Sequence, residues 1–192
     1  MIRMLTTTAA MIAAGLIVAP VGFAQSSQSR PSGSPAASST AKETLNQEDK
    51  TFIKKAATGG MAEVQLSKLA QKSENAEVKS FADRMVRDHT AANEQLTTIA
   101  GSLGVELPKT LDSEHERIRE KLQTLHGKAF DDQYVHAMVE DHNKAVKLFQ
   151  QEERTGHNAE LKQFAHKTLP TLEEHQKMVR QLSQKLAQTA AR

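Results

Sequence analysis

The sequence has 192 residues, no Cys, no Trp and a formal net charge of +2 at pH 7. Without Cys there is no disulfide framework and no thiolate metal site. One Tyr, six Phe, nine Gly and five Pro are too few for a protein of many short strands or for a base-stacking nucleic-acid surface. The composition therefore favours a helical protein.

Residues 1–24 have the pattern of a signal peptide. Arg3 precedes an apolar stretch at 9–19, which is shorter than the ~20 residues that span a bilayer. Gly22-Phe23-Ala24 has the small-x-small form of a signal-peptidase site. We expect cleavage after Ala24 and export to the periplasm; the alternative is an uncleaved N-terminal anchor. No later segment is apolar enough for a transmembrane span.

Residues 25–42 are predicted to be a flexible linker, because seven of the 18 are Ser and no apolar period is present. The remaining region, 43–192, contains all 23 acidic residues. Arg3, Arg30 and Lys42 precede it, so 22 of the 25 basic residues remain there and its net charge is −1. The charge balance gives no indication of nucleic-acid binding.

Helical periodicity predicts four long helices in the domain 43–192. They cover about 46–73, 75–103, 129–154 and the segment after Asn158, where Asn75 and Asn158 are expected N-caps. A short helix, capped by Asp112 or Ser113, is expected to stop at Gly127. Pro170 is expected to kink or split the fourth long helix.

An internal repeat relates the two halves of the domain. The segment 75–82, Asn-Ala-Glu-Val-Lys-Ser-Phe-Ala, matches 158–165, Asn-Ala-Glu-Leu-Lys-Gln-Phe-Ala. The segment between the resulting hairpins, 104–128, is long enough to cross a bundle. We predict an all-α, ferritin-like four-helix bundle of two related hairpins with a long crossover containing a short helix. A plain up-down bundle is the alternative.

Each long helix places one ionisable residue on its apolar face. These residues are Glu63, His89, His142 and His175. A buried carboxylate costs several kcal/mol unless it is paired, hydrogen-bonded or metal-bound. Counting residues from the hairpin turns places the four within roughly 10 Å of one another along the helix axes.

Three interpretations of these residues remain open. They form a site for a single transition metal (Zn, Fe, Mn or Cu), a buried Glu–His hydrogen-bond network, or a set of surface residues on mis-phased helices. Met85 and Met138 lie one helical turn before His89 and His142, and offer softer ligands that suit copper. The other histidines, including His115 in the short helix, show no pattern that suggests a site.

Three motifs resemble a known bacterial family. They are the run Phe81-Ala-Asp-Arg-Met-Val-Arg-Asp-His89, the run Phe130-Asp-Asp-Gln-Tyr134 leading to Met138-Val-Glu-Asp-His142, and Leu169-Pro170 leading to Glu174-His175. Together they are similar to the domain of unknown function 4142 family. The resemblance implies an exported, ferritin-like helical protein, often described as an outer membrane protein, and implies no established reaction.

The wider ferritin-like group often holds two irons through Glu-x-x-His motifs. Here Val86 and Leu172 stand three residues before His89 and His175, so a di-iron site is not expected. No catalytic motif is present, and nothing marks a protein partner or a homo-oligomer. The sequence therefore favours a non-enzymatic exported bundle with a buried Glu/His network. The alternative is a periplasmic metal-binding or metal-dependent redox protein with one inward ligand per helix.

Overall fold

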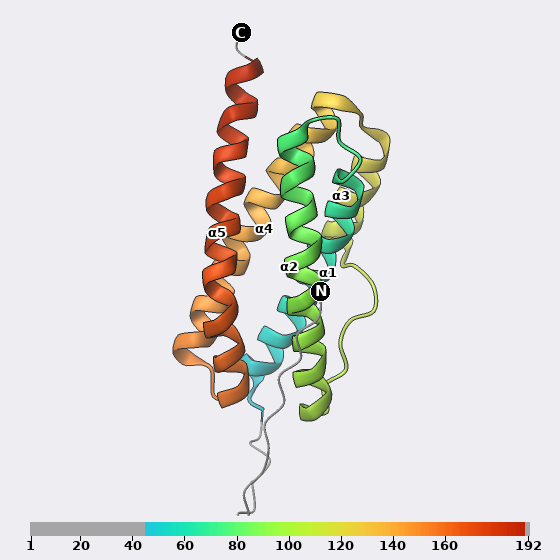
Figure 1. Ribbon diagram of the computed structural model, residues 1–192. Helices are drawn as coiled ribbons and strands as arrows, with labels where there is room; N and C mark the ends of the chain where they lie inside the picture. Colours follow the sequence, from blue (N-terminus) through green and yellow to red (C-terminus); the bar gives the residue numbers. More distant parts are fainter. Residues whose placement is uncertain (1–44, 191–192) are drawn as a thin grey trace, which may run out of the picture. The chain divides into compact units, whose positions relative to one another are not determined.

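The computed structural model describes residues 45–190, which form five α-helices (Figure 1). They are α1 (Gln47–Ala70), α2 (Ala76–Leu103), α3 (Ser113–Thr124), α4 (Gly127–Thr155) and α5 (Ala159–Ala190). Residues 45–190 contain no strand. Within the same range, no helix combines the length and apolar character needed to cross a membrane. The predicted signal peptide, its cleavage site and the predicted linker lie outside the described residues.

Asparagine side chains cap three of the described helices, and two of them, Asn75 and Asn158, are the predicted N-caps. Asn46 and Asp49 form a reciprocal capping box at the start of α1, with Asn46 Oδ1 accepting from Asp49 N at 2.7 Å. Asn75 Oδ1 accepts from two backbone N–H groups at the start of α2. Asn158 Oδ1 accepts from Leu161 N at 3.0 Å. Gly104, with φ of 72°, ends α2 in the left-handed conformation that favours glycine.

Two local expectations were wrong. Gly127 does not end the short helix, because α3 stops at Thr124 and Gly127 begins α4. Pro170 does not split α5, which runs unbroken from Ala159 to Ala190. Proline removes one backbone donor and frees the carbonyl four residues earlier, at His166. Both Pro170 and His166 are exposed, so water can satisfy that carbonyl and the helix continues.

The connections between the helices fix the topology of the bundle. His157 N, in the turn after α4, donates to Asp49 Oδ1 at 3.0 Å, so α4 ends where α1 begins. Ser73 Oγ, after α1, donates to Asp131 Oδ1 at 2.6 Å, so α4 begins where α1 ends. Helices α1 and α4 are therefore antiparallel, and the crossover between α2 and α4 runs the length of the bundle (Figure 1). This is the predicted all-α four-helix bundle with one long crossover.

Helix α3 belongs to this crossover and packs against α1 and α4. Its Leu122 is 1% exposed and joins the core, and Asp112 caps it by accepting from His115 N at 2.9 Å. The described long helices are ordered α1, α2, α5, α4 around the bundle, since each contacts its two neighbours in that order. The plain up-down alternative is therefore excluded.

The apolar core consists of two separate clusters. The first cluster lies toward the α1–α2 turn and includes Leu66, Met85, Tyr134 and Met138. The second cluster lies toward the α4–α5 turn and includes three aromatic rings, those of Phe52, Phe149 and Phe164. In every long helix the ionisable residue predicted to face inward lies between the segments that supply these two clusters.

The sequence repeat occupies equivalent places in the two hairpins. Val78 and Leu161, at matching positions, are both 0% exposed, and so are Ala82 and Ala165. One copy opens α2 and supports the first cluster, and the other opens α5 and supports the second cluster. The two hairpins are therefore related units. Their turns lie at opposite ends of the bundle, one beside each apolar cluster.

Candidate metal centre

A polar layer crosses the middle of the bundle between the two apolar clusters. It consists of Glu63 from α1, His89 from α2, His142 from α4 and His175 from α5, which are 3%, 4%, 0% and 1% exposed. The centroids of the three imidazole rings lie 5.3 to 5.5 Å apart. All four residues predicted from the helical phase therefore come together, and the interpretation as mis-phased surface residues is wrong.

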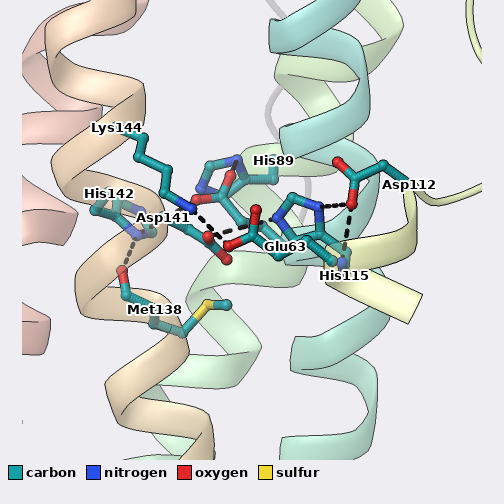
Figure 2. A network of polar contacts seen from close by, with 9 residues as sticks. Glu63, His89, Asp112, His115, Met138, Asp141, His142 and Lys144 are labelled. Carbon is teal, nitrogen blue, oxygen red and sulfur yellow. Dashed lines mark hydrogen bonds and ion pairs between the residues drawn. The ribbon is translucent and has the colours of Figure 1, made fainter. Parts of the chain in front are cut away.

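Glu63 bridges two of the three histidines. Its Oε2 lies 2.9 Å from Nδ1 of His89, and its Oε1 lies 3.4 Å from Nδ1 of His142. His142 Nδ1 also lies 2.9 Å from the backbone carbonyl oxygen of Met138, one turn earlier on α4. Figure 2 shows these side chains meeting inside the bundle. One ring nitrogen of His89 and one of His142 are thus each held by an oxygen acceptor.

His175 is held in the same way by a residue of α2. Its Nε2 lies 2.9 Å from Oδ2 of Asp88, the residue immediately before His89. Asp88 is fixed in turn by Arg84, whose Nε lies 3.3 Å from the same oxygen. Arg84 also donates to Glu174 on α5 at 2.8 Å. A chain of charged groups therefore orients the ring of His175.

Each of the three rings has a second nitrogen that finds no hydrogen-bond partner among the described residues. These atoms are His89 Nε2, His142 Nε2 and His175 Nδ1. One ring nitrogen from each histidine lies within 4.8 Å of those of the other two. Buried polar atoms are almost always paired in proteins, so these three nitrogens point to a bound ligand or water.

Burial and charge set the protonation states of the layer. Burial alone would raise the pKa of Glu63, but the charges of His89 and His142 outweigh it and lower that pKa to about 2. Burial lowers the pKa of His89, yet the Glu63 carboxylate reverses this, and the pKa of His89 is raised. Burial lowers the pKa of His142. Burial and the charge of His89 lower the pKa of His175 to about 4.

His115, for which the sequence showed no pattern that suggests a site, is a buried residue. It is 8% exposed, and its Nδ1 lies 2.9 Å from Oδ1 of Asp112, while its Nε2 lies 3.5 Å from Oδ1 of Asp141. Hydrogen bonding to Asp141 outweighs burial and raises the pKa of His115 to about 9. Figure 2 shows Asp112 and His115 beside the layer. A charged imidazole thus ties the crossover helix α3 to α4.

A cavity of about 560 Å³ extends from this layer toward the second cluster. Glu63, His89 and His175 line one part of it, and His115 and Asp141 line another. Its apolar walls include Ala56, Leu96, Phe164 and Leu172. A ligand in this space has access to the histidine layer.

The comparison with protein families agrees with the three motifs in the sequence. The family model described as Domain of unknown function (DUF4142) matches residues 34–182. The chain belongs to this family. No curated protein matches this DUF4142 chain.

Two solved structures resemble the DUF4142 chain in fold. A DUF305 fragment from Deinococcus radiodurans aligns with a TM-score of 0.65 and 15% identity, over 73% of this chain and 98% of the fragment. A secreted protein DUF305 from Streptomyces coelicolor aligns with a TM-score of 0.61 and 15% identity, over 73% of this chain and 93% of that one. At this identity the likeness concerns the fold alone.

The structure also places the two methionines that were considered as softer ligands. Met85 and Met138 are both 0% exposed and pack in the first apolar cluster. It is the carbonyl oxygen of Met138 that contacts His142 (Figure 2). The residues that sequence reasoning missed were Asp88, Asp141 and His115. The only available signal was that Asp88 and Asp141 each stand directly before a predicted inward histidine.

Proposed function

We propose that this DUF4142 protein binds one first-row transition metal ion through His89, His142 and His175. The observation that carries the proposal is the pairing of the ring nitrogens. In each ring one nitrogen contacts an oxygen acceptor, and the other has no partner among the described residues. An N–H donated to an acceptor leaves a lone pair on the second nitrogen of a neutral ring.

The acceptors are of the kinds that support metal-binding histidines. Such a histidine almost always donates its other N–H to a carboxylate or a backbone carbonyl, which fixes the ring and makes the ligating nitrogen more basic. Here the three acceptors are Glu63, the carbonyl of Met138, and Asp88. In this proposal Glu63, first considered as a fourth ligand, acts by holding Nδ1 of His89.

Three imidazoles suit Zn²⁺, Cu²⁺ or Fe²⁺, and a centre with three protein ligands keeps a coordination position for a further molecule. The cavity beside His89 and His175 gives such a molecule access. A bound metal there can act as a Lewis acid or a redox centre. The absence of a recognisable catalytic motif leaves storage or transfer of the metal as the simpler function.

The second candidate is a metal-free, non-enzymatic bundle whose polar layer is a hydrogen-bonded network. The 2.9 Å contact between Glu63 and His89 and the raised pKa of His89 favour it, because together they describe an ion pair that needs no metal. It leaves the second ring nitrogens of His89, His142 and His175 without a partner among the described residues, and each such buried group costs about 1–3 kcal/mol.

The signal-peptide pattern at residues 1–24 supports export to the periplasm as the setting of this function. An oxidising compartment is also consistent with a histidine centre in a chain without Cys.

Metal analysis of untagged protein tests the proposal. We expect about one ion per chain in the native protein. Zn²⁺ or Cu²⁺ added to chelator-treated protein should raise the melting temperature, since a roughly hundredfold excess over Kd stabilises by about 2.7 kcal/mol. The double variant His142→Gln/His175→Gln should lose both effects. The matched control is His136→Gln/His166→Gln, which changes two exposed histidines on the same two helices.

Two results would decide against the metal. In the first, the native protein contains no metal, and adding Zn, Mn, Fe or Cu at about pH 7.5 leaves its melting temperature unchanged. The other is an equal loss of binding in both double variants. Either result would leave the polar network as the function of the layer.

A further inference from the structure

The cavity below the polar layer has an apolar interior. Ala56, Leu96, Phe164 and Leu172, which line it, are all buried side chains of the second cluster. Its volume of about 560 Å³ falls within the ~300–1,000 Å³ of small-molecule sites. The walls therefore suit an apolar group of moderate size.

Three lysines at one level of the bundle border the same cavity. Lys54 and Lys55 lie eight and nine residues after Asn46, and Lys147 lies eight residues before Thr155. Because α1 begins where α4 ends, each lysine lies about 12–14 Å from that end at 1.5 Å per residue. All three are exposed. They form a cationic border, which we call the lysine rim.

The acidic residues around the cavity do not neutralise the lysine rim. Each acidic residue that lines it has another partner: Glu63 with His89, Asp88 with Arg84, Asp112 and Asp141 with His115, and Glu114 with Lys144. Within residues 45–190 the three lysines of the rim have no ion pair. The rim therefore offers positive charge to an incoming anion.

Gly59 keeps part of the cavity open. It lies in the middle of α1, where glycine is less favourable than alanine because its backbone loses more conformational freedom on folding. No atom lies within 4 Å of where its Cβ would stand, so packing does not require the glycine. The neighbouring Gly60 is different, because a Cβ there would lie 2.0 Å from Asn93 Oδ1. Gly59 lines the cavity, and a side chain at that position would fill space that the glycine leaves free.

We propose that the cavity binds a single-chain amphiphile with an anionic head, of the medium-chain carboxylate class. The head lies at the lysine rim, and the chain extends between the apolar walls toward the histidine layer. From Lys55 to Glu63 is eight residues, or about 12 Å along α1. An extended aliphatic chain of roughly ten carbons, with C–C bonds of about 1.5 Å, covers this distance. The inference does not depend on the metal.

Calorimetry with the full chain in the presence of a chelator tests the proposal. Decanoate should bind. Butanoate should bind at least tenfold more weakly, because its chain is too short to contact the apolar walls. 1-Decanol and decylamine should also bind at least tenfold more weakly, because they lack the anionic head. Equal binding of decanoate, decanol and decylamine would overturn the role of the rim. No binding of decanoate would overturn the proposal as a whole.

Two variants with matched controls locate the ligand. Gly59→Leu should reduce decanoate affinity at least tenfold, whereas Gly101→Leu, at an exposed helical glycine outside the cavity, should not. The triple variant Lys54→Gln/Lys55→Gln/Lys147→Gln should weaken decanoate binding and leave decanol binding unchanged. Its control changes the exposed Lys68, Lys79 and Lys177, which do not line the cavity. Unchanged decanoate affinity in both test variants would place the ligand elsewhere and refute the site.

Discussion

The carboxylate of Glu63 lies 2.9 Å from Nδ1 of His89, and both side chains are 5% exposed or less. The two groups depend on each other, because both are almost completely buried. The carboxylate keeps its charge through the two histidines it contacts, as its pKa of about 2 indicates. Removing one partner therefore has a different energetic consequence from removing the other.

Replacement of Glu63 by Leu should have little effect on the free energy of unfolding of the metal-free protein. An apolar residue of similar size removes a charge whose burial is costly, and such changes are often neutral or stabilising. His89→Leu should destabilise by about 1–3 kcal/mol, because it leaves Glu63 without its closest partner. Urea unfolding in the presence of a chelator measures both. Equal, small effects would show that the pair is not coupled.

If a metal is bound, the variant Glu63→Gln should weaken its affinity about 10–100-fold, which is typical when the partner of a ligating histidine is changed. The ligands themselves stay in place, so the metal still binds at saturating concentration. Competition with a chelator of known affinity measures the change. The control variant Glu140→Gln, at an exposed residue of α4, should leave the metal affinity unchanged.

The ion pairs of His115 should make stability depend on pH in the alkaline range. Its pKa is raised to about 9 in the folded protein, above the unperturbed value of ~6.5. The resulting stabilisation is fully present below about pH 6.5 and is lost as pH rises through about 9. We expect His115→Gln to cost on the order of 2 kcal/mol at pH 6 and much less at pH 10, measured by urea unfolding. A constant difference across this range would contradict the assignment.

Glu152 should also make stability fall as pH rises, but over a lower pH range than His115. It is 4% exposed, and burial, followed by the negative charge of Asp49, raises its pKa to about 7. The folded protein therefore holds this proton more tightly than the unfolded chain does, and stability falls as pH rises from about 4.5 to 7. The change in the free energy of unfolding caused by Glu152→Gln should be about 1–3 kcal/mol more stabilising at pH 8 than at pH 4. A difference of the same size for the neighbouring Glu153→Gln, at a more exposed position, would contradict the assignment.

Mass spectrometry of the protein from the periplasmic fraction should give a mature chain that begins at Gln25. The small residues Gly22 and Ala24 support cleavage at this bond. Replacing Ala24 by a bulky residue should leave a longer precursor in the membrane fraction. A mature chain that begins at Met1 would refute the export proposal.

The helices and their caps could be predicted from the sequence because their causes are local. Asn75 and Asn158 stabilise the starts of α2 and α5 through contacts within three residues. The inward positions of Glu63 and His89 followed from helical phase alone. The residue count from the turns predicted a spread of roughly 10 Å, although the two turns lie at opposite ends of the bundle. The layer still forms, because the three histidines lie near the midpoints of their helices and Glu63 lies little more than one turn past the midpoint of α1. Helix midpoints lie at the same level whichever end the residues are counted from.

The contacts of His115 and Asp88 could not be predicted from local patterns. His115 becomes buried only because the crossover brings α3 against α1 and α4, and its partner Asp141 is 26 residues away. Asp88 lies beside an inward residue on α2, but its bond to His175 depends on the packing of α2 against α5. Both contacts depend on how distant helices are placed, for which a single sequence has no local marker.

The position of the polar layer between two apolar clusters determines how the helices can slide past one another. A shift of one helix by one turn, about 5.4 Å, would leave apolar side chains opposite Glu63 or Asp88. The shifted bundle would retain most of its hydrophobic contacts but would bury a carboxylate without a partner, at a cost of several kcal/mol. Aliphatic clusters alone tolerate such sliding, because one leucine replaces another with little loss. The layer thus sets a single longitudinal alignment of the four long helices, whether or not it holds a metal.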